Sequence, residues 1–164
     1  MLVIVEGIDG SGKSTLCENL KQKGYKILRK ERNDKQYGVT DMIRFQISPF
    51  KYVMDRALLT QWAYRLLDGK DLDKGDFDLI VTLRVLRESP VIYCNCPTAF
   101  KYSMERGETN ICTLEQREKL SQIYNFIIGT LRLYDITNIY EYNFEKQTVD
   151  DVLNFIKEVK DGIR

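Results

Sequence analysis

Histidine is absent from the 164-residue chain. Every mechanism that needs an imidazole as base, nucleophile or metal ligand is therefore excluded, and acid–base work is left to Asp, Glu, Lys, Tyr or Cys. An excess of charge of one sign is also lacking, because 25 Lys and Arg residues face 24 Asp and Glu residues, for a net charge of +1. This balance gives no general attraction to nucleic acid or to an anionic membrane, although a local basic patch stays compatible with it.

Long apolar runs and a disulfide framework are missing as well. No stretch is long enough to span a bilayer, and the first apolar run, residues 2–5, ends at Glu6. This pattern indicates a core strand rather than a signal peptide, so we expect a cytoplasmic protein with no membrane partner. The cysteines are Cys17, Cys94, Cys96 and Cys112. Their spacing fits neither disulfides nor a zinc site and indicates buried thiols in a reducing compartment.

A glycine-rich motif at residues 7–15 follows the first apolar run. It has the complete form GxxxxGK(S/T), with Gly7, Gly12, Lys13 and Ser14 at the defining positions. Glycines let the backbone turn so that successive N–H groups cradle the β-phosphate of a nucleotide. Lys13 would bridge the β- and γ-phosphates, Ser14 would ligate Mg²⁺, and the following helix would direct its positive end at the anion.

The alternative for this motif is a chance match in a glycine-rich turn. A strand before the motif and a helical pattern after it favour a nucleoside triphosphate site instead. The residues expected to contact ATP are Gly7, Asp9, Gly10, Ser11, Gly12, Lys13, Ser14 and Thr15.

Hydrophobic patterning alternates between strands and helices along the whole chain. Strands are expected at about 2–6, 25–28, 50–54, 90–95 and 139–142. Helices are expected at about 13–23, 39–47, 56–67, 98–106, 114–134 and 149–159. Residues 77–87 could form a strand or a helix, and the spacing of their apolar side chains favours the helix.

This alternation predicts one α/β domain over residues 1–164, with a five-stranded parallel sheet covered by helices on both faces. Ligands of such sheets bind beyond the carboxyl ends of the strands. The phosphate-binding motif and the pair Asp55-Arg56 both follow predicted strands. We therefore expect them to line the same cleft.

Asp55 and Arg56 form the second candidate site. A carboxylate at the end of a strand suits a second contact to Mg²⁺, usually through water, or the role of base for an attacking hydroxyl. Arg56 can offer its planar guanidinium to a second phosphate. The alternative is that Asp55 merely caps the next helix. Because a phosphate-binding motif is present, we favour the functional interpretation.

Further basic side chains follow the second predicted strand. They are Arg29, Lys30, Arg32, Lys35 and Arg44. We expect one or two of them to clamp an acceptor phosphate and the rest to be solvated surface. Arg106 stands near the end of a predicted helix and before a polar bend, which suits a lid over about 98–113 that brings positive charge to the γ-phosphate. Charge pairing at the end of that helix is the alternative.

Several of these segments resemble the thymidylate kinase family. Residues 5–15, Val-Glu-Gly-Ile-Asp-Gly-Ser-Gly-Lys-Ser-Thr, resemble its phosphate loop, in which an acidic residue, here Glu6, precedes the first glycine. Residues 53–56, followed by 59–64, resemble its strand-end Asp-Arg motif and the helix after it.

The resemblance continues towards the C-terminus. Residues 91–97 and 106–108 resemble the strand that leads to the family's lid. Residues 143–156 resemble its last strand-to-helix turn, near which the adenine of ATP usually sits. Thymidylate kinases are commonly homodimers, so the resemblance also makes a homodimer an expectation.

The resemblance implies a three-layer P-loop fold like that of nucleoside monophosphate kinases, and transfer of the γ-phosphoryl group of ATP·Mg²⁺ to an acceptor. In this implied site, Lys13 and Ser14 hold phosphate and metal, and Asp55 supports metal and acceptor. Arg56 grips the acceptor phosphate, and Arg106 reaches in from the lid. Gly10 stands where one branch of the family has an arginine, so the chain resembles the branch whose lid supplies that charge.

The segment between the second and third strands, residues 29–49, is shorter than the base-recognising segment of thymidylate kinases. Arg44 and Phe45 are its candidates for base contacts. The shortened outline also resembles small virus-encoded kinases of this group, some of which act on modified nucleotides or on a hydroxyl within DNA.

Three functions are compatible with these residues. The leading one is a kinase for a small-molecule acceptor, a deoxynucleoside monophosphate that is dTMP-like or a modified pyrimidine. The second is a kinase that phosphorylates a hydroxyl of a nucleoside or of a modified base in DNA. The third is a nucleotide-binding switch, against which stands the lack of an Asn-Lys-x-Asp run for reading guanine.

Overall fold

A parallel β-sheet forms the centre of the computed structural model, which describes residues 1–29, 37–70, 79–105 and 113–162. The strands of these residues are β1 (Leu2–Gly7), β2 (Lys26–Arg29), β3 (Tyr52–Asp55), β4 (Val91–Cys94) and β5 (Ile139–Tyr142). They lie in the order β2-β3-β1-β4-β5, and every neighbouring pair is parallel. The predicted five-stranded parallel sheet is confirmed.

Helices follow the strands as the apolar spacing predicts. They are α1 (Lys13–Gln22), α2 (Val39–Gln46), α3 (Leu58–Leu67), α4 (Leu79–Glu88), α5 (Ala99–Glu105), α6 (Leu114–Leu133) and α7 (Val149–Lys160). The ambiguous segment 77–87 is thus helical where it is described. None of the described helices is long and apolar enough to cross a membrane.

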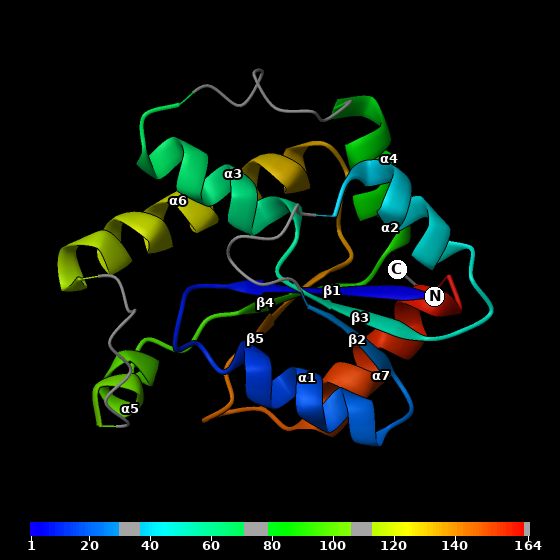
Figure 1. Ribbon diagram of the computed structural model, residues 1–164, viewed down its shortest axis with the longest axis horizontal. Coiled ribbons are helices and arrows are strands. Elements are labelled where there is room, and N and C mark those ends of the chain that lie inside the picture. Colours follow the sequence, from blue (N-terminus) through cyan, green and yellow to red (C-terminus); the bar gives the residue numbers. More distant parts are fainter. Residues whose placement is uncertain (30–36, 71–78, 106–112, 163–164) are drawn as a thin grey trace.

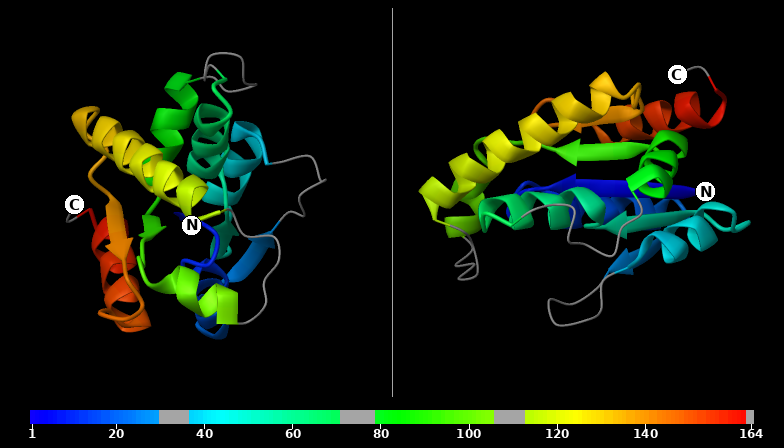
Figure 2. Two further views of the ribbon diagram at one scale, coloured as in Figure 1. Left: turned by 90° about the vertical axis from the view of Figure 1, so that its left-hand side faces the viewer. Right: turned by 90° about the horizontal axis from the view of Figure 1, so that it is seen from above.

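The helices cover the sheet in two layers. Helices α1 and α7 lie on one face, and α2, α3, α4 and α6 lie on the other (Figures 1 and 2). Successive strand residues point to opposite faces, so Val3 and Val5 join the core beneath α1 and α7, while Leu2 and Ile4 join the core beneath the other four helices. Both faces are buried, which explains why β1 is apolar almost throughout.

All strands end at the same edge of the sheet, since all are parallel. The phosphate-loop motif leaves β1 at this edge, Asp55 ends β3, and Arg29 ends β2. Helix α5 follows β4 and lies beyond the same edge (Figure 1). The topology therefore brings together segments that are far apart in the sequence.

The cysteines that the structure describes are buried, as the sequence predicts. Cys17, Cys94 and Cys96 carry free thiols in the interior. Burial raises the pKa of the Cys94 thiol to about 12. Cys112 lies outside the described residues.

Candidate active site

The phosphate loop owes its shape to glycines at positive φ. Gly7, Gly10 and Gly12 have φ values of 141°, 77° and 89°, a region that costs other residues energy. A Cβ atom on Gly12 would lie 2.7 Å from Cδ1 of Phe144, and one on Gly7 would overlap the carbonyl oxygen of Cys94. The loop therefore has no room for side chains at these positions.

Two features of the loop fit a bound phosphate. The hydroxyl of Ser11 is buried and has no hydrogen-bond partner among the described residues, and the N-terminus of α1 begins directly after Gly12. A buried hydroxyl without a partner is costly, and a phosphate oxygen would satisfy it. The loop is therefore suited to hold the β-phosphate as the motif predicts.

Lys13 lies folded against this loop. Its ammonium donates a hydrogen bond of 2.6 Å to the carbonyl of Ile8 and lies 3.9 Å from Oδ1 of Asp9. Its side chain is only 4% exposed. Burial lowers the pKa of Lys13, the charge of Arg56 lowers it further, and Asp9 opposes both. The ammonium is thus held by the backbone of the loop in this structure, next to the position that a triphosphate would take.

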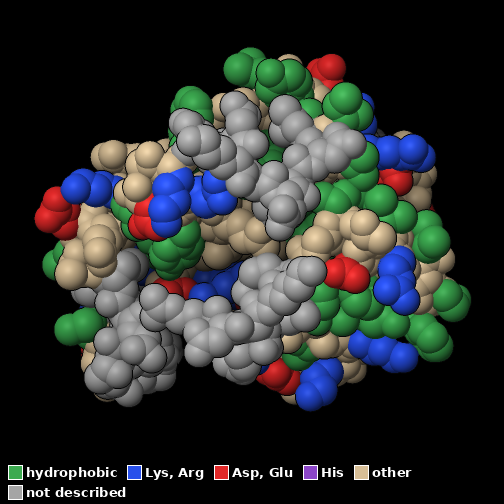
Figure 3. Space-filling model, turned by 45° about the horizontal axis from the view of Figure 1, so that its top comes forward, with side chains coloured by type: hydrophobic (Ala, Val, Ile, Leu, Met, Phe, Trp, Pro, Cys, Tyr) green, Lys and Arg blue, Asp and Glu red, His purple; other side chains and the backbone are tan. Residues whose placement is uncertain are grey.

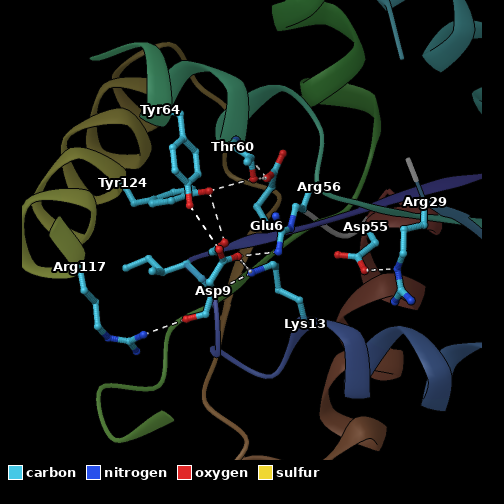
Figure 4. A network of polar contacts seen from close by, with 12 residues as sticks. Glu6, Asp9, Lys13, Arg29, Asp55, Arg56, Thr60, Tyr64, Arg117 and Tyr124 are labelled. Carbon is cyan, nitrogen blue, oxygen red and sulfur yellow. Dashed lines mark hydrogen bonds and ion pairs between the residues drawn. The ribbon is translucent and has the colours of Figure 1, made fainter. Parts of the chain in front are cut away.

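Arg56, the residue after β3, reaches the same carboxylate. Its Nη2 donates to Oδ1 of Asp9 at 2.5 Å, and the hydroxyl of Tyr64 approaches Oδ2 at 3.5 Å. The backbone of Arg56 has φ 68°, a conformation that is rare for residues other than glycine and is concentrated at functional sites. Figure 4 shows how Arg56 and Lys13 converge on Asp9 from two segments.

Asp55 lies beside this group and is held by Arg29. Its Oδ2 accepts a 2.7 Å hydrogen bond from Nε of Arg29, while Oδ1 is buried and has no partner among the described residues. An oxygen left over in this way can receive a metal-bound water or a proton. Ser14 lies in the first turn of α1 and is exposed. The described residues contain no cluster of three or more acidic, His or Cys metal ligands, and a site for Mg²⁺ needs none, because substrate phosphates supply further ligands.

Glu6, rather than Asp55, caps the helix after β3. Oε1 of Glu6 accepts from the backbone N–H groups of Ala57 and Leu59, each at 3.0 Å, and Oε2 accepts from that of Thr60 at 3.1 Å. The interpretation of Asp55 as a helix cap is therefore wrong. Burial raises the pKa of Glu6 to about 7, although these hydrogen bonds lower it.

The Glu6 carboxylate is hydrogen-bonded to a chain of hydroxyl groups. The Thr60 hydroxyl donates to Oε2 at 2.5 Å and lies 2.9 Å from the hydroxyl of Tyr124 on α6. Tyr124 in turn donates to the carbonyl of Gly7 at 3.4 Å. The start of the phosphate loop is thus connected to α3 and α6 (Figure 4).

Arg117 on α6 is a site residue that the sequence did not reveal. Its guanidinium donates from Nη1 to the carbonyl of Asp9 at 2.9 Å and from Nη2 to the carbonyl of Cys96 at 3.0 Å. One signal was available, because Arg117 occupies the buried stripe of its helix. The other members of that stripe are Leu120, Tyr124, Ile127, Ile128 and Leu131. A charged residue in an apolar stripe needs hydrogen-bond partners.

The remaining residues that were predicted to bind substrate do not all lie at the site. Arg29 belongs to the site because its guanidinium pairs with the carboxylate of Asp55. Arg44 is exposed on α2 with its guanidinium 4.0 Å from Asp41. Phe45 packs against the rings of two other residues, Tyr37 and Tyr52. Arg32 and Arg106, as well as Lys30 and Lys35, lie outside the described residues. Contacts of these side chains to an acceptor stay predictions.

Charged side chains of both signs lie next to the phosphate loop. In the space-filling view, blue and red side chains meet in a recess on the left of the molecule (Figure 3). In the close-up, Lys13, Arg56, Asp9 and Asp55 point into one region at the ends of β1 and β3 (Figure 4). The two cations can attract phosphate oxygens, and the two carboxylates can receive the waters of a bound Mg²⁺.

No family model matches this sequence, and no curated protein matches it. Solved structures of similar fold exist. The YorR protein of Bacillus subtilis, in complex with phosphorylated GDP, is 17% identical with a TM-score of 0.65, over 99% of this chain and 94% of that one. The deoxyadenosine kinase of M. mycoides with bound dATP is 19% identical with a TM-score of 0.59, over 94% and 97%. The thymidylate kinase of Candida albicans is 17% identical with a TM-score of 0.54, over 98% and 91%.

At identities this low, structural likeness establishes the fold alone, and these three structures agree on the fold. The matches extend over nearly the full length of each chain. The chain therefore has the thymidylate kinase-like fold of the P-loop nucleotide kinases.

Proposed function

We propose that this protein transfers the γ-phosphoryl group of ATP to a deoxynucleoside monophosphate that is dTMP-like or a modified pyrimidine nucleotide. One observation carries the proposal: Lys13 of the phosphate loop and Arg56 of the strand-end pair both contact Oδ1 of Asp9, at 3.9 Å and 2.5 Å. Two cations from separate segments thus meet at one point. Phosphoryl transfer between two nucleotides needs such a meeting, because the donor and acceptor phosphates must come together and repel each other.

The roles follow from the positions. The loop and Lys13 would bind the donor phosphates, and Arg56, whose side chain is 50% exposed, would move from Asp9 to the acceptor phosphate. Ser14 and Asp55 would hold Mg²⁺, which neutralises phosphate charge in such reactions. Arg29 fixes the orientation of Asp55 through their 2.7 Å hydrogen bond. Arg106 is proposed as a further phosphate ligand from the resemblance alone.

A monophosphate acceptor suits these residues better than a hydroxyl. The second pKa of a phosphate monoester is about 6, so its oxygen is largely ionised at neutral pH and needs no base. A hydroxyl needs one. The chain contains no histidine, and one oxygen of Asp55 is already committed to Arg29.

A nucleoside or DNA hydroxyl is the second candidate acceptor, and a specific observation supports it. Oδ1 of Asp55 is buried without a partner among the described residues, so it could accept a proton. A deoxyadenosine kinase of M. mycoides, with the products dCMP and dCDP bound, also has this fold, at 19% identity and a TM-score of 0.62.

Transfer from γ-labelled ATP to a panel of acceptors separates these functions. The panel contains each deoxynucleoside monophosphate, each deoxynucleoside, and plain and modified DNA. We expect labelled diphosphate from one or more monophosphates. Label only in nucleosides or only in DNA would replace the leading proposal with the second one, and ATP binding without any transfer would favour the switch.

Lys13→Ala provides the catalytic control for this panel. We expect it to reduce turnover at least a hundredfold, since it removes charge that neutralises the transferred phosphoryl group. Lys21→Ala is the matched variant on the same helix, because Lys21 is 63% exposed and pairs only loosely with Glu18, at 3.7 Å. Its turnover should equal that of the unaltered chain.

A further inference from the structure

Two side chains of helix α6 donate hydrogen bonds to backbone carbonyls of the phosphate loop. Tyr124 donates to the carbonyl of Gly7 at 3.4 Å, and Arg117 donates to the carbonyl of Asp9 at 2.9 Å. The two residues lie seven positions apart, which is about two helical turns and places them on one side of the helix. Alternate carbonyls of the loop are thus held by one rigid element.

Arg117 also joins the loop to the start of α5. Its Nη2 donates at 3.0 Å to the carbonyl of Cys96, and the same carbonyl accepts the backbone N–H of Ala99, the first residue of α5, at 3.1 Å. Its side chain is buried, with Arg117 8% exposed as a residue. A buried guanidinium is stable only where its donors are used, so its two carbonyl partners fix its position, and it fixes theirs.

A fixed carbonyl orients the next N–H group. Because a trans peptide is planar, the carbonyl of Asp9 and the N–H of Gly10 point in opposite directions. Arg117 draws the carbonyl towards α6, so the N–H of Gly10 is directed to the other side of the loop. Gly10 has φ 77° and, as a glycine, could adopt many other conformations in the absence of this restraint.

We propose that Arg117 is a positioning residue: it holds the phosphate loop in its phosphate-binding conformation and ties the loop to the start of α5. The effect on turnover rests on the proposed function, whereas the effect on the loop does not. Arg117 acts through the carbonyls of Asp9 and Cys96 and touches no phosphate. Loop and α5 therefore keep one relative position as long as both hydrogen bonds exist.

Hydrogen–deuterium exchange of the free protein tests this directly. In Arg117→Ala, backbone amides of residues 7–13 should exchange about tenfold faster or more, the factor expected when hydrogen bonds to a charged group are lost. Amides of α7 should exchange at an unchanged rate. Arg132→Ala is the matched control, because Arg132 lies on the same helix and is exposed.

Kinetics provide the second readout. Arg117→Ala should lower kcat/KM for ATP at least tenfold and leave KM for the acceptor within about twofold, since the loop binds the donor. Added guanidinium at low concentration should restore part of the activity of this variant, and an equal concentration of urea should not. Should the unaltered chain transfer no phosphate, the proposed function fails, while the exchange experiment still decides the role of Arg117.

Three results would overturn the proposal. Lost turnover with unchanged exchange at residues 7–13 would mean that Arg117 contacts a phosphate directly. Faster exchange throughout the chain, α7 included, would mean that Arg117 stabilises the whole fold. Unchanged exchange and unchanged turnover would leave it no role at the loop. If Arg117→Ala does not fold, Arg117→Lys decides by the same criteria, because lysine keeps the charge and cannot span both carbonyls.

Discussion

The buried carboxylate of Glu6 should make the stability of this protein depend on pH in an unusual direction. Glu6 is fully buried, and its pKa is raised from 4.5 to about 7, chiefly by burial. Below about pH 4.5, Glu6 is protonated in the folded and the unfolded chain, and the stability that it contributes is fully present. As the pH rises through about 7, the unfolded chain releases the proton first, and this stability is lost.

The size of the effect follows from the pKa difference. One pKa unit corresponds to about 1.4 kcal/mol, so a rise from 4.5 to about 7 amounts to about 3 kcal/mol of unfolding free energy. Most carboxylates of folded proteins act in the opposite direction, because partners lower their pKa. The absence of histidine removes the side chain that would otherwise titrate in this range.

Urea unfolding at a series of pH values measures the effect, with Glu6→Gln as the perturbation. The unfolding free energy of the unaltered chain should fall by about 3 kcal/mol relative to that of Glu6→Gln between about pH 4.5 and pH 8. Glu18→Gln is the control, because Glu18 is 52% exposed, and its difference from the unaltered chain should stay flat. A pH-independent difference for Glu6→Gln would show that Glu6 does not titrate differently in the folded and the unfolded chain.

Two further predictions concern the pairs at the ends of β2 and β3. Arg29→Met leaves the buried Asp55 carboxylate without the partner that it holds at 2.7 Å, so the unfolding free energy at pH 7 should fall by about 1–3 kcal/mol; thermal unfolding measures this, and an unchanged midpoint would exclude a structural role for the pair. Arg56→Ala should raise KM for the acceptor tenfold or more while ATP affinity, measured by calorimetry, stays the same. Arg56→Gly should show the same rise in KM for the acceptor. Its unfolding free energy should nevertheless be about 1 kcal/mol higher than that of Arg56→Ala, because φ is 68° at this position. A change in ATP affinity alone would show that Arg56 does not bind the acceptor.

The sequence predicted features that local patterns determine. The phosphate loop is a contiguous motif, and its neighbours β1 and α1 follow from hydrophobic spacing. Asp55 and Arg56 were found for a similar reason, since carboxyl ends of parallel strands share one edge. The helix at 79–88 was the weakest of these predictions, because a short apolar run fits a strand as well.

The roles of Glu6 and Arg117 depend on contacts that local patterns do not determine. Glu6 meets Thr60 across 54 positions of the chain, and Arg117 meets Asp9 across 108. Both contacts depend on how the strands and helices are arranged in space, which periodicity alone leaves open. The resemblance marked Glu6 only as a family feature, and its function as the cap of α3 became visible through the hydrogen bonds.

The fate of the γ-phosphate of ATP shows most directly whether this protein is a nucleotide kinase. Phosphorus NMR of the protein with Mg²⁺, ATP and dTMP or a modified pyrimidine monophosphate follows every phosphorus-containing species in one sample. We predict that ADP and a deoxynucleoside diphosphate form in equal amounts, and that Lys13→Ala forms neither. Unchanged ATP with every monophosphate, or ADP that appears together with inorganic phosphate alone, would show that the protein transfers no phosphoryl group to these acceptors.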